Sequence, residues 1–180
     1  MKNENDVLRD VAKKFSDAGI AYMLTGSMAM IYYAQPRMTR DIDIVAALHP
    51  GQVESILRIF GSDYYVAREA VISSIEHGSL FNFIHNETFI KVDCIIQKGS
   101  EYRKTEFGRR KKVQFGDFEI YIVSKEDLMI SKLDWARDSR SELQLRDVKN
   151  LIESGFDHEY MDHWTQKLGL DNLWKECLHE

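Results

Sequence analysis

Two short stretches decide the fold of this chain: Leu24-Thr25-Gly26-Ser27 and Arg40-Asp41-Ile42-Asp43-Ile44. The first is typical of a strand that ends in a Gly-Ser turn and opens a helix, which offers backbone N–H groups and a hydroxyl to a phosphate. The second alternates acidic and apolar residues as a strand does, so Asp41 and Asp43 point to the same face. Two neighbouring carboxylates repel each other, and a divalent cation is the usual remedy. A phosphate cradle beside a metal-holding pair indicates nucleotide chemistry.

A third acid stands in another apolar strand, Ile90-Lys91-Val92-Asp93-Cys94-Ile95-Ile96. Asp is disfavoured inside strands, so acids placed against that preference indicate a functional site, and the alternative is a solvated strand face. If the strand of Asp93 neighbours that of Asp41 and Asp43, three carboxylates can converge on one or two Mg²⁺ or Mn²⁺ ions.

Periodicity and turn signals predict the remaining elements. Two Ser residues followed by acidic or amide side chains fit capping boxes and begin helices at 124 and 141. Helices are expected over 5–18, 26–32, 52–60, 124–138, 141–153 and around 160–168, and strands over 21–25, 40–46, 79–85, 88–97, 111–115 and 118–123. Trp135, Trp164 and Trp174 are expected to pack the helical tail together.

The bulk composition is that of a globular protein. The chain has 180 residues, 44% of them hydrophobic, and a net charge of −5, so no global polycation calls for nucleic acid. Two cysteines exclude a disulfide framework and favour a reducing, cytoplasmic location. We see no signal peptide and no apolar run of the ~20 residues that a membrane span needs.

The Gly26-Ser27 turn, the Asp41-x-Asp43 pair and the later Asp93 resemble the signature of the nucleotidyltransferase superfamily. The resemblance implies an α+β polymerase β-like fold, with a mixed sheet flanked by helices and a C-terminal helical bundle. Its expected domains are a nucleotidyltransferase core over residues 1–123 and a helical region over 124–180 packed on that core. The segment from Glu126 through Val148 looks like the tail of small bacterial members, including AbiEii-like toxins. In that group a helix lysine and a downstream acid contribute to the nucleotide site, and Lys132 and Asp147 match them.

The resemblance implies transfer of an NMP from an NTP to an acceptor hydroxyl, with release of pyrophosphate. Asp41, Asp43 and Asp93 would be the catalytic metal ligands, and Asp93 can also receive the acceptor's proton. Gly26 and Ser27 would bind the triphosphate at the start of the helix.

Thirteen residues separate Ser27 from Asp41, a gap at the long end of the family's pattern. The loop that fills it carries Arg37 and Arg40, and either can bind a phosphate or merely neutralise Asp41.

The acceptor stays open between a macromolecule and a small molecule. RNA or protein would suit a toxin of a toxin–antitoxin or phage-defence pair, with an antitoxin as partner. An antibiotic or other small molecule, or a non-catalytic nucleotide-binding module, is the alternative. A basic strip over 103–112 favours nucleic acid, or is simply a solvated loop, and the acidic net charge opposes nucleic acid.

Overall fold

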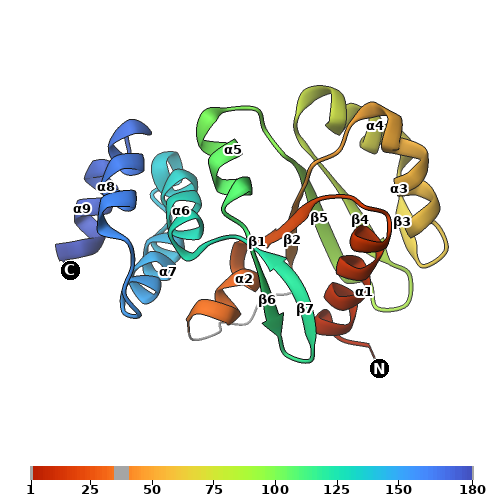
Figure 1. Ribbon diagram of the computed structural model, residues 1–180, viewed down its shortest axis with the longest axis horizontal. Coiled ribbons are helices and arrows are strands. Elements are labelled where there is room, and N and C mark those ends of the chain that lie inside the picture. Colours follow the sequence, from red (N-terminus) through yellow and green to blue (C-terminus); the bar gives the residue numbers. More distant parts are fainter. Residues whose placement is uncertain (1, 35–40, 180) are drawn as a thin grey trace.

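The computed structural model describes residues 2–34 and 41–179, which form a mixed seven-stranded sheet flanked by helices (Figure 1). The elements are α1 (Glu4–Asp17), β1 (Tyr22–Thr25), α2 (Gly26–Tyr33), β2 (Ile42–Ala46), α3 (Val53–Phe60), β3 (Tyr64–Val66), α4 (Arg68–His77), β4 (Leu80–His85), β5 (Lys91–Ile96), α5 (Glu101–Gly108), β6 (Lys111–Phe115), β7 (Phe118–Ile122), α6 (Lys125–Ser139), α7 (Glu142–Ile152), α8 (His158–Lys167) and α9 (Asp171–His179).

The strands lie in the order β3-β4-β5-β2-β1-β7-β6. The pairs β2–β5 and β1–β7 are parallel, and the other neighbours are antiparallel. The sheet is therefore mixed, as the sequence predicts. Its central strands β1, β2 and β5 carry the Gly-Ser turn and the acids.

Local sequence explains why the elements begin where they do. Asn3 caps α1 in a capping box with Asp6. The side chain of Ser124 accepts a hydrogen bond from the backbone N–H of Asp127 and so starts α6, as the capping box predicts. Strand β5 buries every second residue, which is the period of a half-buried strand.

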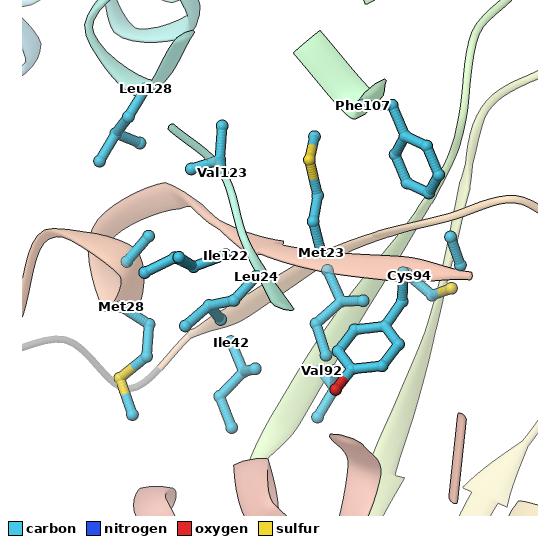
Figure 2. Packing of buried hydrophobic residues seen from close by; sticks show 14 of the residues in the cluster. Met23, Leu24, Met28, Ile42, Val92, Cys94, Phe107, Ile122, Val123 and Leu128 are labelled. Carbon is cyan, nitrogen blue, oxygen red and sulfur yellow. The ribbon is translucent and has the colours of Figure 1, made fainter. Parts of the chain in front are cut away.

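Different helices pack on the two faces of the sheet. On one face α1 and α3 pack through Phe15 and Phe60, and the ring of Phe60 stacks on Phe83 of β4 at 4.3 Å between centroids. On the other face α5 lies over β1, where Met23 reaches toward Phe107. Figure 2 shows Met23 on that side and Leu24, Ile42 and Val92 on the opposite side of β1. The residues beyond the reach of α5 on this second face include the acids.

Helices α6 to α9 form a group beside the sheet, drawn in blue at the left of Figure 1. Their anchor is Asp127, which is fully buried. Its carboxylate accepts hydrogen bonds from Ser124 Oγ at 2.6 Å, Arg109 Nε at 3.1 Å and Tyr160 OH at 2.6 Å. The boundary at 123/124 as a division between folding units stays a prediction.

Four helices and strands escaped the sequence prediction: β3, α4, α5 and α9. Strand β3 is only three residues long, and α4 has no sharp apolar stripe. The basic strip over 103–112 is part of a helix, α5, followed by strand β6, and not a loop. Trp135 is 74% exposed, so the expectation that it packs the tail is wrong, whereas Trp164 and Trp174 are buried as expected. Among the helices of the described residues, none is long and apolar enough to cross a membrane.

Candidate active site

The acids come together because β2 and β5 are parallel neighbours in register. Asp43 lies directly beside Asp93, and Thr25 of β1 lies on the other side of Asp43. Paired residues of adjacent strands share a face, so these three side chains form one row across the sheet. The condition set in the sequence analysis, that the strand of Asp93 neighbours the strand of Asp43, is met by this register.

Asp43 carries the electrostatic strain of the row. Its side chain is largely buried, and its pKa is raised to about 6, chiefly by burial and then by the charges of Asp93 and Asp41. Lys91 and Lys132 act in the opposite direction. Asp41 stands just before β2 and is exposed. Its charge raises the pKa of Asp43, so the two carboxylates lie within electrostatic range of each other.

Only one of the two carboxylate oxygens of Asp93 has a polar partner among the described residues. Its Oδ2 atom forms an ion pair with Lys91 Nζ at 3.0 Å, and this partner raises the pKa of Lys91. Its Oδ1 atom is buried and has no hydrogen-bond partner among the described residues. A buried carboxylate oxygen without a donor is costly, and such atoms mark places where a ligand completes the structure. Sequence reasoning missed Lys91, although its spacing of two from Asp93 places both on one face.

Gly26 lies directly against Asp43. It has a φ of +65°, and a Cβ built on it would collide with Asp43 Oδ2 and lie 2.8 Å from Asp43 Cγ. Only glycine combines this left-handed backbone with this close approach. The helix α2 that begins here has Thr25 as its N-cap, and Thr25 makes no side-chain cap hydrogen bond within the described part of the chain. The hydroxyl of Thr25 is therefore not used to cap the first turn of α2.

Lys132 and Asp147 are paired with each other. Both are buried, and Lys132 Nζ lies 2.6 Å from Asp147 Oδ2 and 3.1 Å from Gln144 Oε1. The positive charge of Lys132 nevertheless reaches Asp43, because it lowers the pKa of that acid. Arg37 and Arg40 lie outside the described residues.

The acids fit a metal only in combination with another ligand. Across residues 2–34 and 41–179, no three His, Cys, Asp or Glu side chains are arranged as a complete metal site. Mg²⁺ is usually held by one or two carboxylates together with substrate phosphates, so Asp43 and the unpartnered oxygen of Asp93 match half of such a site. Cavities of about 390 and 350 Å³ lie elsewhere, beside His85 and beside Arg68.

Three of the six cations of the basic strip form ion pairs with carboxylates, while Lys104 and Lys111 are exposed. Arg103 pairs with Glu106 and Asp134, Arg109 with Glu126 and Asp127, and Lys112 with Glu119. Arg110 lies over the ring of Phe107 and donates to its carbonyl. These cations hold α5, α6 and β7 together instead of presenting a phosphate-binding track.

Solved structures with a similar fold include nucleotidyltransferases and a nucleotidyltransferase-like protein. A nucleotidyltransferase-like antigen of Paracoccidioides brasiliensis superposes with a TM-score of 0.57 at 16% identity, over 96% of this chain and 92% of the other. The chain has the nucleotidyltransferase fold. The lincosamide antibiotic adenylyltransferase LnuA, bound to lincomycin, gives a TM-score of 0.53 at 16% identity, over 82% of this chain and 94% of its own. The antibiotic-resistance factor ANT(2'')-Ia gives 0.57 at 10% identity, over 96% and 95%.

This nucleotidyltransferase fold was expected from the Gly-Ser turn and the three acids. No family model matches the chain, and no curated protein is significantly similar in sequence. The AbiEii-like subtype is therefore a finer assignment than these likenesses support.

Proposed function

We propose that the protein is a metal-dependent nucleotidyltransferase that moves an NMP from an NTP to an acceptor hydroxyl. The observation that carries the proposal is the row of Thr25, Asp43 and Asp93, with Gly26 directly against it. The register puts two carboxylates side by side on a half-open face, where their mutual repulsion opposes folding and a bound cation relieves it.

Asp43 and Asp93 would hold Mg²⁺ or Mn²⁺ together with the triphosphate, and Asp41 is proposed as a further ligand. The unpartnered Oδ1 of Asp93 and the raised pKa of Asp43 are what such a cation would correct. When bound, the metal supplies positive charge that neutralises the phosphates and the leaving pyrophosphate.

The chain's own residues bind the nucleotide and move the proton. The N-terminus of α2, with Gly26 and Ser27, faces the triphosphate with backbone N–H groups. Lys132 adds positive potential at the acids while Asp147 fixes its ammonium group. Arg37 and Arg40 are proposed as further phosphate ligands.

The acceptor oxygen forms a bond to the α-phosphorus of the NTP, and the bond between that phosphorus and the bridging oxygen breaks to release pyrophosphate. The proton of the acceptor hydroxyl passes to the carboxylate of Asp93 and from there to water. Positioning the hydroxyl within hydrogen-bond reach of this carboxylate is the main task of the site.

A small-molecule acceptor has the support of a specific observation. Three of the six cations in the basic strip, which favoured RNA, are engaged in ion pairs with Glu and Asp side chains. Two structures with this fold act on or are named for antibiotics, which are small molecules. Transfer to RNA or protein, as in a toxin with an antitoxin partner, is the competing proposal. Growth of bacteria expressing wild type or Asp43→Asn tests it, and equal growth counts against a toxin.

Transfer itself is tested with labelled NTPs and Mg²⁺ or Mn²⁺. The acceptors are cell RNA, cell protein, lincomycin, tobramycin and two simple ring polyols, methyl glucoside and myo-inositol. We expect a labelled product with wild type and with Asp171→Asn, a surface acid that pairs only weakly with Lys175 at 3.7 Å, and none with Asp43→Asn. No NTP binding and no product with any acceptor would contradict the proposal.

A further inference from the structure

The row of acids continues beyond Asp93 toward the edge of the sheet. Asn82 of β4 is the direct partner of Asp93, and Ile84 stands two residues further along β4. Ile84 in turn is the direct partner of Tyr65 in β3. Direct partners and residues two apart share a face, so Tyr65, Ile84, Asn82 and Asp93 all project from the same side of the sheet.

This side of β3 and β4 is open. Tyr65 is 65% exposed, Asn82 is exposed and Ile84 is half-buried, while Phe81 and Phe83 on the opposite face are buried. The alternation is complete, so the exposure belongs to one face and not to a frayed strand. A single exposed tyrosine needs no explanation. Here an aromatic ring, an aliphatic side chain and an amide share a face with a carboxylate that has one unpartnered oxygen. Together they form a surface that changes from apolar to polar toward Asp93.

We infer that Tyr65, Ile84 and Asn82 form the acceptor subsite and that it takes a hydroxylated ring, such as a sugar or a cyclitol. This inference rests on the proposed nucleotidyl transfer and names its substrate class. The apolar face of such a ring packs on Tyr65 and Ile84, and the amide of Asn82 hydrogen-bonds a hydroxyl.

The dimensions of the surface suit a small molecule. Adjacent strands lie about 5 Å apart and two residues along a strand span about 7 Å, so the Cα atoms of Tyr65 and Asp93 are roughly 12 Å apart. A molecule of two linked rings covers this distance, with one ring on Tyr65 and the reacting hydroxyl beside Asp93. The hydroxyl oxygen then attacks the α-phosphorus, its proton passes to Asp93, and pyrophosphate leaves.

The inference predicts that substitutions in the subsite weaken acceptor binding and leave nucleotide binding nearly unchanged. Tyr65→Ala and Asn82→Ala should each raise KM for the acceptor about 10-fold or more and leave KM for the NTP within about twofold. Tyr65→Phe keeps the ring and should behave as wild type. Leu178→Ala, which truncates an exposed apolar side chain on α9, is the matched surface control.

Binding is measured directly so that the result does not depend on turnover. The Asn82 amide and Tyr65 ring signals are followed by NMR during titration with methyl glucoside, myo-inositol, lincomycin and tobramycin, and NTP binding is measured in the same samples. We expect at least one compound to shift both signals in wild type and to bind at least 10-fold more weakly to Tyr65→Ala and Asn82→Ala.

Two results would overturn the subsite. One is that no compound shifts these signals, and the other is that a compound binds or reacts equally well with both alanine variants. Transfer confined to RNA or protein, unchanged by the two variants, also overturns it. Loss of NTP binding in wild type is a separate outcome, because it contradicts the proposed function itself.

Discussion

Two groups of buried or half-buried carboxylates in this protein are built in opposite ways. Asp127, between α5, α6 and α8, is fully buried and receives hydrogen bonds on both oxygens from Ser124, Arg109 and Tyr160. Asp93, on the sheet, has a buried oxygen that accepts no hydrogen bond from a described residue, and its neighbour Asp43 is also an acid. The first group is complete within the chain, whereas the second is not.

The difference separates structural acids from functional ones. A satisfied carboxylate stabilises the native state in the absence of a ligand, because its desolvation is offset by donors and a cation. An unsatisfied pair reduces stability until something positive binds, and such local costs concentrate at functional sites. Substitutions at the two places should therefore have opposite effects on stability and on activity.

The largest effect is expected on transfer. Asp43→Asn and Asp93→Asn keep the shape of the side chain and remove its charge, so each should lower the transfer rate on the order of 10³-fold. Asp127→Asn should change the rate of the remaining folded protein by less than about 10-fold. The readout is labelled product per mole of folded enzyme. Equal losses in all three variants would show that Asp127 matters for transfer as much as Asp43 and Asp93 do.

The next largest effect is on stability. Asp127→Ala leaves Arg109 and Tyr160 without their shared acceptor and should lower the free energy of unfolding by about 4 kcal/mol. Urea denaturation at pH 7 measures it. Arg109 keeps Glu126 as a second partner at 3.3 Å, so a loss below about 1 kcal/mol would show that this pair alone anchors the helices.

Asp43 should make the folded protein less stable as pH rises, which is the opposite of the effect of a carboxylate whose pKa is lowered by folding. Its pKa is raised to about 6 in the folded protein, above the ordinary 3.8, so the folded state holds this proton more tightly than the unfolded state. The stability that wild type derives from this group is present below pH 4 and is lost as pH rises toward 6. One pKa unit corresponds to about 1.4 kcal/mol, so Asp43→Asn should gain about 3 kcal/mol over wild type across this range.

Urea unfolding of the two proteins in EDTA between pH 4 and 7 tests this expectation. Because other acids titrate in both proteins, the quantity to follow is the difference between them. A difference that stays constant with pH would show that Asp43 is not strained by its neighbours.

The smallest effect distinguishes two glycines. Gly19 and Gly26 both have a φ of +65°, but a Cβ at Gly19 meets nothing within 4 Å, and one at Gly26 collides with Asp43. Gly19→Ala should cost about 1 kcal/mol for the backbone alone. Gly26→Ala should cost about 1–2 kcal/mol more and reduce transfer, as Asp43 is displaced. Thermal unfolding of the two variants, compared directly, measures the excess.

The sequence was sufficient to predict the centre of the site, because the signals that mark its residues are local. Strand alternation places Asp41 and Asp43 on one face, and the Gly-Ser turn marks the start of α2. The adjacency of Asp93 and Asp43 required the parallel pairing of β2 and β5, which alternation alone does not specify and the family resemblance suggested.

Other features depend on contacts that no local pattern encodes. Lys132 and Asp147 sit fifteen residues apart on two helices and meet only when α6 packs on α7. The ion pairs of Arg103 and Arg109 reach α6, so two cations of a strip that is basic in sequence are neutralised in the fold. Tyr65 escaped notice because β3 is too short to show a period.

The most direct test of the difference between the two groups of acids is Mn²⁺ binding with and without a non-hydrolysable NTP analogue. Two carboxylates form only half of a metal site, so wild type should bind Mn²⁺ at least 10-fold more tightly when the analogue is present. Asp43→Asn and Asp93→Asn should lose this binding, and Asp171→Asn should keep it. Equal Mn²⁺ affinity in all four proteins would contradict the assignment of the sheet acids as an incomplete site that the substrate completes.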